Sequence, residues 1–344
     1  MKKLKRRLEE LFRKGEEFVR NIKNGEKVIL IYDSDVDGVS SAYLMLSALE
    51  KFGKKVDATL ACSWGKLEKI KKRIKNFDKI ITVDVPVDLI EKNFLQENKK
   101  MLIIDHHPCD DLNSENIILI NPRLEKSWIY QPTSYVIYKM FNFLKEKEWV
   151  ASLGTVGDFG IDDCKDLIRV KDKKNIWKTK YGKASVLVGN AISVLGAESV
   201  LEMFLKAKDL KDLIRRREII NASKKFEEEL KNSEKEFFRN LEIVGDVWIS
   251  EVKPVYAGIC SALITQLSTK NPEKIIFLLE EGKNNVKIHG RCGSKKVNIG
   301  FLFKKLGIGG GHEAAGAGII NKKDKNKLKI EILEELRDFT RIKR

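Results

Sequence analysis

Short apolar runs alternate with longer amphipathic stretches through the first half of the chain, and this alternation restricts the folds open to it. The runs that we expect to be strands cover residues 27–32, 56–60, 79–83, 101–104 and 116–120. The stretches between them include 39–52 and 65–75, which have the length and apolar spacing of helices. Strands and helices that alternate in this way build a mostly parallel sheet with helices on both faces. We therefore predict an α/β domain that binds its ligand at the carboxyl ends of the strands.

The pattern changes after a mainly helical region at about 132–206. Residues 207–242 are dense in Lys, Arg and Glu and contain few turn residues, so we expect a long linker helix there. Strand-like runs at 247–252, 275–280 and 286–289 then surround a helix at about 257–268. We predict three parts, which are a catalytic domain over 1–206, a linker helix over 207–242 and a smaller α/β domain over 243–344.

Composition limits the class of protein and the kind of partner. No apolar run approaches the ~20 residues that cross a bilayer, and residues 1–25 are too charged for a secretory signal. These residues place apolar side chains along one helical face, which predicts an amphipathic docking helix. We expect a cytoplasmic protein with no membrane partner. Lys and Arg number 66 against 50 Asp and Glu, a net charge of +16, which favours a polyanionic partner, with nucleic acid first.

The five cysteines are scattered and form no CxxC pair, so a disulfide framework or a zinc ribbon is not expected. An acidic string, Asp33-Ser34-Asp35-Val36-Asp37-Gly38, follows the first predicted strand. A similar string opens an EF-hand calcium loop, but that loop needs Glu at its twelfth position, where this chain has Leu44. The string also follows a strand instead of a helix. We interpret it as a cluster of oxygen ligands for Mn²⁺ or Mg²⁺ at a strand-to-helix turn.

Three further motifs add ligand-type side chains. Asp84 follows the third predicted strand, Asp105-His106-His107 follows the fourth, and Asp158 lies in a glycine-flanked turn. Carboxylates that meet at one sheet edge repel each other strongly unless a cation lies between them. Oxygen-rich ligation with one or two imidazoles is typical of a two-metal hydrolytic site, which activates water and clamps a phosphoryl group. The pattern predicts phosphoester hydrolysis.

A glycine-rich segment near the end of the chain suggests how a substrate is held. Gly309, Gly310 and Gly311 precede His312, and the residues from Glu313 onwards begin like a helix. Glycines before a helix N-terminus form an anion cradle from backbone N–H groups. We expect Arg291 and His312 to grip a phosphate or a terminal nucleotide there; a hairpin carrying a chance histidine is the alternative.

Taken together and in this order, these motifs resemble the DHH phosphoesterase superfamily, and most closely its RecJ-like branch with a DHH-associated C-terminal domain. The resemblance covers nearly the whole chain. Its first motif is Asp33 to Gly38, its second Asp84, its third Asp105 to Pro108 and its fourth Gly157-Asp158, with the glycine triplet and His312 as the C-terminal signature.

The resemblance implies two divalent metal ions, Mn²⁺ above Mg²⁺, and assigns roles to the residues. One ion would take Asp33, Asp35 and Asp84. The other would take Asp37, Asp84, His106 and Asp158, with Asp84 as the bridge. Asp105 would orient His106, and His107 would face the substrate phosphate, with Arg291 adding positive charge in the transition state.

Several functions remain open on this basis. The leading hypothesis is an exonuclease on single-stranded DNA or RNA that releases mononucleotides, in DNA repair, replication or RNA degradation. A nanoRNase or a small-nucleotide phosphatase, acting on short oligonucleotides, cyclic dinucleotides or adenosine bisphosphate, is the nearest rival. Exposed base-stacking aromatics, for which Trp64 and Trp128 are candidates, would favour long strands. The remaining alternatives are a pyrophosphatase and a scaffold in a replication complex, and an active nuclease could also dock on a replication or repair protein through residues 1–25.

Overall fold

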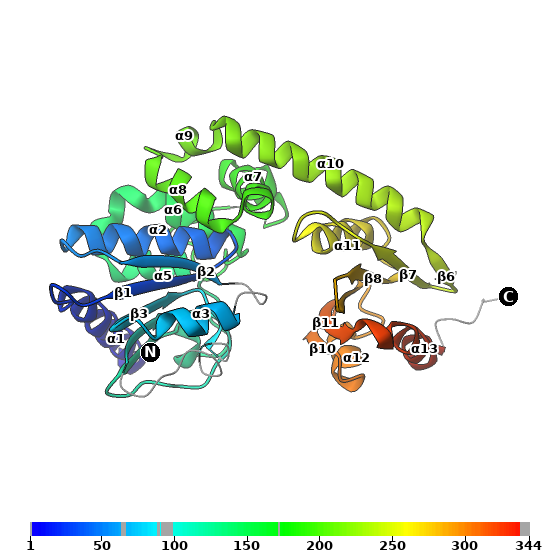
Figure 1. Ribbon diagram of the computed structural model, residues 1–344, viewed down its shortest axis with the longest axis horizontal. Coiled ribbons are helices and arrows are strands. Elements are labelled where there is room, and N and C mark those ends of the chain that lie inside the picture. The colour runs from blue at the N-terminus through cyan, green and yellow to red at the C-terminus, as the bar shows by residue number, and fades with distance from the viewer. Residues whose placement is uncertain (1, 63–66, 88–89, 91–98, 171–172, 338–344) are drawn as a thin grey trace. The chain divides into compact units, whose positions relative to one another are not determined.

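The computed structural model describes residues 2–62, 67–87, 90, 99–170 and 173–337 of the 344-residue chain (Figure 1). It divides into two compact units, Met1–Ser223 and Lys224–Arg344. The domain limits at 206 and 243 stay predictions. In the described part of the chain, no helix combines the length and apolar character that crossing a bilayer requires.

A five-stranded sheet forms the centre of the N-terminal unit. All of its neighbouring strands are parallel, and they lie in the order β2-β1-β3-β4-β5. This confirms the predicted parallel α/β architecture. The strands are β1 (Val28–Asp33), β2 (Ala58–Cys62), β3 (Lys79–Val83), β4 (Lys100–Ile104) and β5 (Ile117–Ile120).

Both faces of this sheet pack against apolar cores, and its central strand β1 is apolar from Val28 to Tyr32 instead of at every second position. In β1, Val28, Leu30 and Tyr32 point into one core and Ile29 and Ile31 into another. A strand that is covered on both faces needs this kind of continuous apolar run. Because both faces of such a strand are apolar, helices must cover both sides of the sheet, as the sequence predicts.

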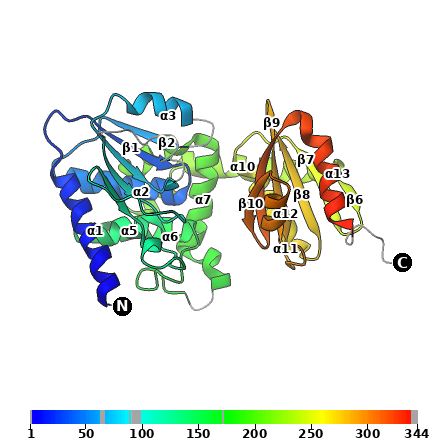
Figure 2. The same cartoon turned by 90° about the horizontal axis from the view of Figure 1, so that it is seen from below.

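The larger core lies under most of the helices, whereas α3 (Leu67–Ile74) covers the opposite face with Ile70 and Ile74. Figure 2 shows α3 and α2 on opposite sides of β1 and β2. The helices that pack on the larger core are α1 (Lys2–Arg20), α2 (Val36–Lys51), α5 (Thr133–Met140), α6 (Glu148–Gly157), α7 (Lys180–Leu195) and α8 (Ala197–Lys206).

The N-terminal helix α1 docks on its own unit. Leu11, Phe18 and Val19 are buried in the larger core. A side chain at Gly15 would place its Cβ 2.5 Å from Cε of Met140, so glycine allows α1 to approach α5 closely. Most of the apolar face predicted for residues 1–25 is thus used within the chain, which leaves little of it for a protein partner.

The charged stretch after α8 contains the long helix that the sequence predicts, α10 (Arg217–Arg239), preceded by the short helix α9 (Leu210–Ile214). Asp209 caps α9, because its side chain accepts a hydrogen bond from the N–H of Asp212 at 2.7 Å. Leu210 and Leu213 are buried in the larger core. The first turns of the charged stretch therefore belong to the packing of the N-terminal unit.

The C-terminal unit is built on a six-stranded sheet in the order β10-β11-β9-β8-β7-β6, in which only β7 and β8 are parallel. Helix α11 (Ile259–Lys270) packs on one face, and α12 (Ile299–Lys305) and α13 (Lys325–Glu335) pack on the other (Figure 2). The strands are β6 (Glu242–Val244), β7 (Val247–Val252), β8 (Ile275–Glu281), β9 (Asn285–Cys292), β10 (Gly309–His312) and β11 (Ala315–Asn321).

The prediction of a helix after the glycine triplet is wrong, because β10 and β11 form a hairpin there. Ala315 to Asn321 pair along their whole length with β9, and this ladder outweighs the helical preference of the residues after Glu313. A Cβ at Gly309 or Gly311 would collide with the backbone of β11, so glycine permits the two strands to pair this closely. The proposed anion cradle at a helix N-terminus is thereby excluded.

Candidate metal centre

The order of the parallel strands reverses beside β1, since β2 lies on one side of it and β3 on the other. In open α/β sheets the crevice at such a switch point, outside the carboxyl ends of the strands, is where ligands bind. Asp33 is the last residue of β1, and Asp84 directly follows β3. Asp105 directly follows the next strand, β4. The fold therefore gathers the acidic motifs at one edge.

The turn after β1 is held by its own polar groups. The Asp33 carboxylate accepts from the N–H of Ser34 at 2.6 Å, and the Ser34 hydroxyl donates to the carbonyl of Cys62 at 2.6 Å. Asp35 caps α2 by accepting from the N–H of Gly38 at 2.8 Å. A Cβ at Gly38 would collide with the carbonyl of Asp33. Glycine at this position lets the acidic turn close tightly.

Asp37 is fully buried and is held by the start of α5. Its carboxylate accepts hydrogen bonds from the N–H groups of Thr133 at 2.7 Å and Ser134 at 3.2 Å, and from the Ser134 hydroxyl. The Thr133 hydroxyl donates to Oδ1 of Asp84 at 3.0 Å. Sequence reasoning missed both residues. The signal was the Pro132-Thr133-Ser134 string, which is typical of a helix start and whose free N–H groups suit an anion.

Asp84 has an unusual backbone conformation. Its φ is +62°, which non-glycine residues rarely adopt and which costs roughly 1–3 kcal/mol. Its N–H donates to the carbonyl of Ile104 at 2.9 Å, so the ladder between β3 and β4 fixes this geometry. The side chain is buried. Such strain is retained where the surrounding structure requires one side-chain direction, and here that direction is towards the other carboxylates.

His106 joins Asp84 to Asp158, the residue that ends α6. Its Nε2 lies 3.5 Å from Oδ1 of Asp84 and 3.2 Å from Oδ2 of Asp158. Tyr130 donates to the same oxygen of Asp158 at 3.2 Å, and its ring contacts that of His106. Arg123 stacks over Tyr130 and donates to the carbonyl of His106 at 2.7 Å. Tyr130 and Arg123 are further supports that the sequence did not reveal.

The role expected for Asp105 needs correction, because Asp105 orients His107 and not His106. Its Oδ1 lies 2.8 Å from Nδ1 of His107, and its Oδ2 accepts from the N–H of His107 at 3.2 Å. An aspartate readily bonds the backbone two residues ahead, and this local turn selects His107. Nδ1 of His106 is buried and lacks a hydrogen-bond partner within the described residues. The polar contacts of the His106 ring are thus those of Nε2.

The structure brings together all six side chains that were predicted to bind metal. In each of three groups, one potential ligand atom per residue lies within 4.8 Å of the others. The first group below matches the set expected for one ion. The second contains three of the four residues expected for the other ion and lacks Asp84, which shares the third group with His106 and His107. The groups are Asp33–Asp35–Asp84, Asp37–His106–Asp158 and Asp84–His106–His107.

Charge in this cluster is not balanced by the protein. In the described parts of the chain, no lysine or arginine forms an ion pair with any of these five carboxylates. His106 lies within 4 Å of two of them, and the charge of His107 acts on Asp33 and Asp35. Burial, followed by the charges of Asp37 and Asp35, raises the pKa of Asp84 well above its ordinary value. Burial and the charge of Asp35 raise the pKa of Asp33 to about 7. Divalent cations fit this donor set, because they would remove the repulsion that the protein leaves in place.

The two histidines differ in charge. Burial lowers the pKa of His106 to about 4, so its imidazole is neutral and keeps a lone pair for a metal ion. Burial also acts to lower the pKa of His107, but the hydrogen bond to Asp105 and the charges of Asp105 and Asp33 outweigh it and raise that pKa. His107 is therefore the better cation of the pair and the better partner for a phosphate.

The predicted substrate-binding residues lie in the C-terminal unit. Arg291 and His312 both pair in register with Ala315, from β9 and β10 respectively, so they flank it on neighbouring strands. His312 is exposed and Arg291 is half-buried. In the described residues no carboxylate pairs with Arg291, whose guanidinium donates to the carbonyl of Gly290 at 2.9 Å. A half-buried guanidinium without an acidic partner is suited to an anionic ligand.

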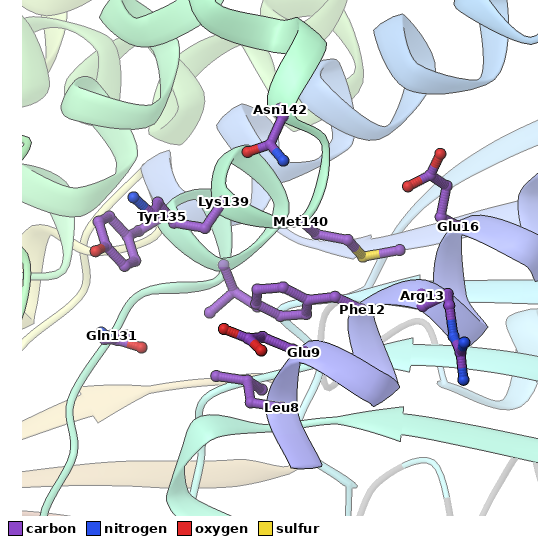
Figure 3. A pocket seen from close by; sticks show the side chains of 11 residues that line it. Leu8, Glu9, Phe12, Arg13, Glu16, Gln131, Tyr135, Lys139, Met140 and Asn142 are labelled. Carbon is purple, nitrogen blue, oxygen red and sulfur yellow. The ribbon is translucent and has the colours of Figure 1, made fainter. Parts of the chain in front are cut away.

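A cavity of about 510 Å³ lies between α1 and α5, away from the acidic cluster (Figure 3). Phe12 points into it from α1 and Met140 from α5. None of the residues of the candidate metal centre lines it, so we do not connect it with phosphoester chemistry. Its lining consists of Leu8, Glu9, Phe12, Arg13, Glu16, Gln131, Tyr135, Val136, Lys139, Met140 and Asn142.

Comparison with known families agrees with this arrangement. The model of the DHH family, N-terminal domain, matches residues 27–157, and that of the DHHA1 domain matches residues 245–340. A parallel sheet with an acidic edge, followed by a second sheet unit, is the fold of the metal-dependent DHH phosphoesterases. The chain belongs to the DHH superfamily and has a RecJ-like fold. No curated protein sequence is significantly similar to it.

Several solved structures share this fold at low sequence identity. RecJ from Thermus thermophilus, in complex with Mn²⁺, superimposes with a TM-score of 0.71 at 14% identity, covering 96% of this chain and 55% of its own. The chain thus spans about half the length of that enzyme. An exonuclease RecJ bound to manganese gives 0.66 at 12% identity, covering 94% and 93%. The pGpG-specific phosphodiesterase PggH from Vibrio cholerae gives 0.53 at 16% identity, covering 91% and 100%.

Proposed function

We propose that this chain is a two-metal-dependent phosphodiesterase that digests single-stranded DNA or RNA from an end and releases mononucleotides. The observation that carries the proposal is the convergence of five carboxylates and His106 at the switch point of the sheet, without a lysine or arginine to balance them in the described residues. Such a cluster serves chemistry that needs divalent cations, and the hydrolysis of phosphoesters is the chemistry of this superfamily.

Asp33, Asp35 and Asp84 would hold one ion, and Asp37, Asp84, His106 and Asp158 the other. When bound, two Mn²⁺ or Mg²⁺ ions supply an activated water and neutralise the charge of the phosphoryl group. The protein keeps its ligands in place through Thr133 and Ser134, which fix Asp37 and Asp84 by hydrogen bonds. It keeps His106 neutral by burial, so that one ring nitrogen retains a lone pair for a metal ion.

Other residues act on the substrate. His107 is 37% exposed on its side chain, is held by Asp105 and has a raised pKa, so it offers a positive charge to a phosphate oxygen. Arg291 and His312 would bind a phosphate or terminal nucleotide on the C-terminal sheet. Gly310 lies between Gly309 and Gly311 in the triplet, and a Cβ there would meet nothing within 4 Å, so a strand or nucleotide can approach that backbone closely.

Two features support a nucleic-acid strand as the substrate. The net charge of +16 attracts a polyanion. Trp128 is 71% exposed, with Nζ of Lys126 5.2 Å from the centre of its ring, so it is not part of the core. An aromatic ring beside a cation is suited to a base and its phosphate. Trp64, the other aromatic candidate, lies outside the described residues.

A second candidate is a phosphodiesterase for very short oligonucleotides or cyclic dinucleotides. The observation that favours it is the structural match to the pGpG-specific phosphodiesterase, which covers 91% of this chain and 100% of that one. The two candidates share the metal centre and differ in the length of strand that they accept.

A digestion series tests the proposal. Single-stranded DNA and RNA of about 2 to 30 nucleotides, labelled at either end, would be incubated with Mn²⁺ and the wild-type chain or Asp84→Ala. Cleavage of long strands to mononucleotides is the expected result. Cleavage restricted to the shortest oligomers would support the second candidate. A wild-type chain that cleaves nothing would contradict the proposal and favour the scaffold alternative. An Asp84→Ala variant that cleaves normally would contradict the two-metal mechanism.

A further inference from the structure

Two aromatic side chains stack on each other at the surface of the N-terminal unit. The rings of Phe159 and Trp177 are nearly parallel, with an interplanar angle of 18° and centroids 5.9 Å apart. Phe159 is 45% exposed and Trp177 is 44% exposed. The pair therefore presents a flat apolar surface to solvent, although burial of these rings would be favourable.

Phe159 directly follows Asp158, a candidate metal ligand. Its φ is +56°, a left-handed conformation that is an outlier for a bulky side chain. Backbone hydrogen bonds hold this turn. The N–H of Phe159 donates to the carbonyl of Val156 at 3.1 Å, and the N–H of Gly160 donates to the carbonyl of Thr155 at 3.0 Å. Strain of this kind is typical of functional positions. The turn fixes the Cα of Phe159 about 3.8 Å from that of Asp158, the candidate ligand.

The segments that carry Trp177 and Phe159 contribute to the same small hydrophobic core. Val156, Ile161 and Ile168 from the region around the Asp158 turn form a buried cluster with Ile176, the neighbour of Trp177. These four side chains are at most 4% exposed. The two exposed rings are therefore carried by segments that share one buried core.

The segments around the pair contain a further exposed aromatic residue and several lysines in the sequence. Trp128, Phe159 and Trp177 are the exposed aromatic residues among the described part of the N-terminal unit. The turns that carry Trp128 and Phe159 are tied together, because the N–H of Tyr130 donates to Asp163 at 2.8 Å. Residues 173–180, which include Trp177, contain four lysines in sequence. Aromatic rings interleaved with lysines are the usual combination for single-stranded nucleic acid.

We propose that Phe159 and Trp177 form a platform that stacks on a nucleobase of the strand whose phosphodiester lies at the candidate metal centre. The platform rests on the proposed function and adds to it a binding site for one base, independent of base identity, because every base has a flat π-face. It would hold the strand in position, while the acidic cluster and His107 act on the phosphate.

The test combines variants of Trp177 with strands that lack a single base. An abasic residue is moved one position at a time along a short single strand, and Kd is measured by fluorescence anisotropy with Ca²⁺ in place of Mn²⁺. The values of KM and kcat are then measured with Mn²⁺. The variants are Trp177→Ala, Trp177→Phe, which keeps a ring, and Leu205→Ala, which shortens another exposed apolar side chain of the same unit, 52% exposed.

For Trp177→Ala we expect Kd and KM to rise by about 5- to 150-fold, the range that base stacking spans on alanine substitution, with kcat changed less. One abasic position should weaken binding to the wild type by a similar factor and leave Trp177→Ala unaffected, because both changes remove the same contact. Trp177→Phe should keep most of the affinity, and Leu205→Ala should match the wild type.

Equal abasic penalties in the wild type and in Trp177→Ala at every position would overturn the platform. Unchanged Kd for Trp177→Ala would overturn it as well. A wild-type chain that binds strands but cleaves none would contradict the proposed function instead, and the binding measurements would still decide on the platform. Thermal unfolding of each variant checks that the small core around Ile176 is intact. If Trp177→Ala fails to fold, Trp177→Leu, which removes the ring but keeps an apolar side chain, replaces it with the same expected result.

Discussion

Replacement of Thr133 by valine tests whether residues behind the acidic cluster tune the candidate metal centre. Thr133 is fully buried, and its hydroxyl donates to Oδ1 of Asp84 at 3.0 Å. Valine has nearly the same shape and keeps the N–H that donates to Asp37 at 2.7 Å. The change therefore removes one hydrogen bond to the shared carboxylate and little else.

The expected loss follows from the charge of the acceptor. A hydrogen bond to a charged group contributes about 1.5–3 kcal/mol, which is about 10- to 150-fold in an equilibrium constant. Loss of a partner behind a metal ligand costs about 10- to 100-fold in affinity in other proteins. We expect Thr133→Val to weaken Mn²⁺ binding by about 10- to 100-fold, as measured by isothermal titration calorimetry of the metal-free chain.

Thr155 offers a matched control. It is also a fully buried threonine, on α6, and its hydroxyl has no hydrogen-bond partner within the described residues. Thr155→Val should keep the wild-type Mn²⁺ affinity, because no bond to a ligand is lost. Equal affinity in Thr133→Val and wild type, or an equal loss in both variants, would refute the reasoning.

Three more predictions concern charge and substrate. Asp105→Asn should lower the pKa of His107, shift the alkaline limb of the pH–rate profile to lower pH and slow hydrolysis by about 10- to 100-fold; an unshifted profile would contradict the contact between them. Burial raises the pKa of Asp33 and Asp37 to about 7 in the metal-free chain. Between the ordinary carboxyl pKa and about pH 7, the folded state therefore keeps protons on these two groups that the unfolded state has already released. Their contribution to the free energy of unfolding declines as the pH rises through that window. The increase in Tm that Mn²⁺ causes should therefore become larger as the pH rises across the same window. An increase in Tm that does not depend on pH would contradict these raised pKa values. His312→Ala should raise KM and leave the metal content unchanged, whereas loss of metal would show that His312 has another role.

Sequence patterns predicted the sheet of the N-terminal unit and its acidic edge for physical reasons. A parallel strand buried on both faces is an uninterrupted apolar run, and the polar residue that ends it is visible in the sequence. Asp33, Asp84 and Asp105 could thus be placed at strand ends, and parallel strands bring their carboxyl ends to one edge. Which of these side chains touch each other depends on strand order, which the sequence did not specify.

Other features depended on contacts between distant segments. The residues after Gly311 have a local preference for helix, but pairing with β9, a strand formed more than 20 residues earlier, decides for a hairpin. The bonds from Thr133 to Asp84 and from Tyr130 to Asp158 join positions 49 and 28 residues apart. The partner of Asp105 was mistaken for a different reason, since a short local turn favoured His107 over the adjacent His106.

The central claim is that Asp84 is shared by two metal ions. The most direct measurement is the number of Mn²⁺ ions retained per chain by the wild type and by Asp84→Asn, determined by elemental analysis after equilibrium dialysis. Two ions in the wild type, and a loss of at least one in Asp84→Asn, are the result that the proposed function predicts. A wild-type chain that retains one ion or none, or an Asp84→Asn variant that retains two, would contradict it.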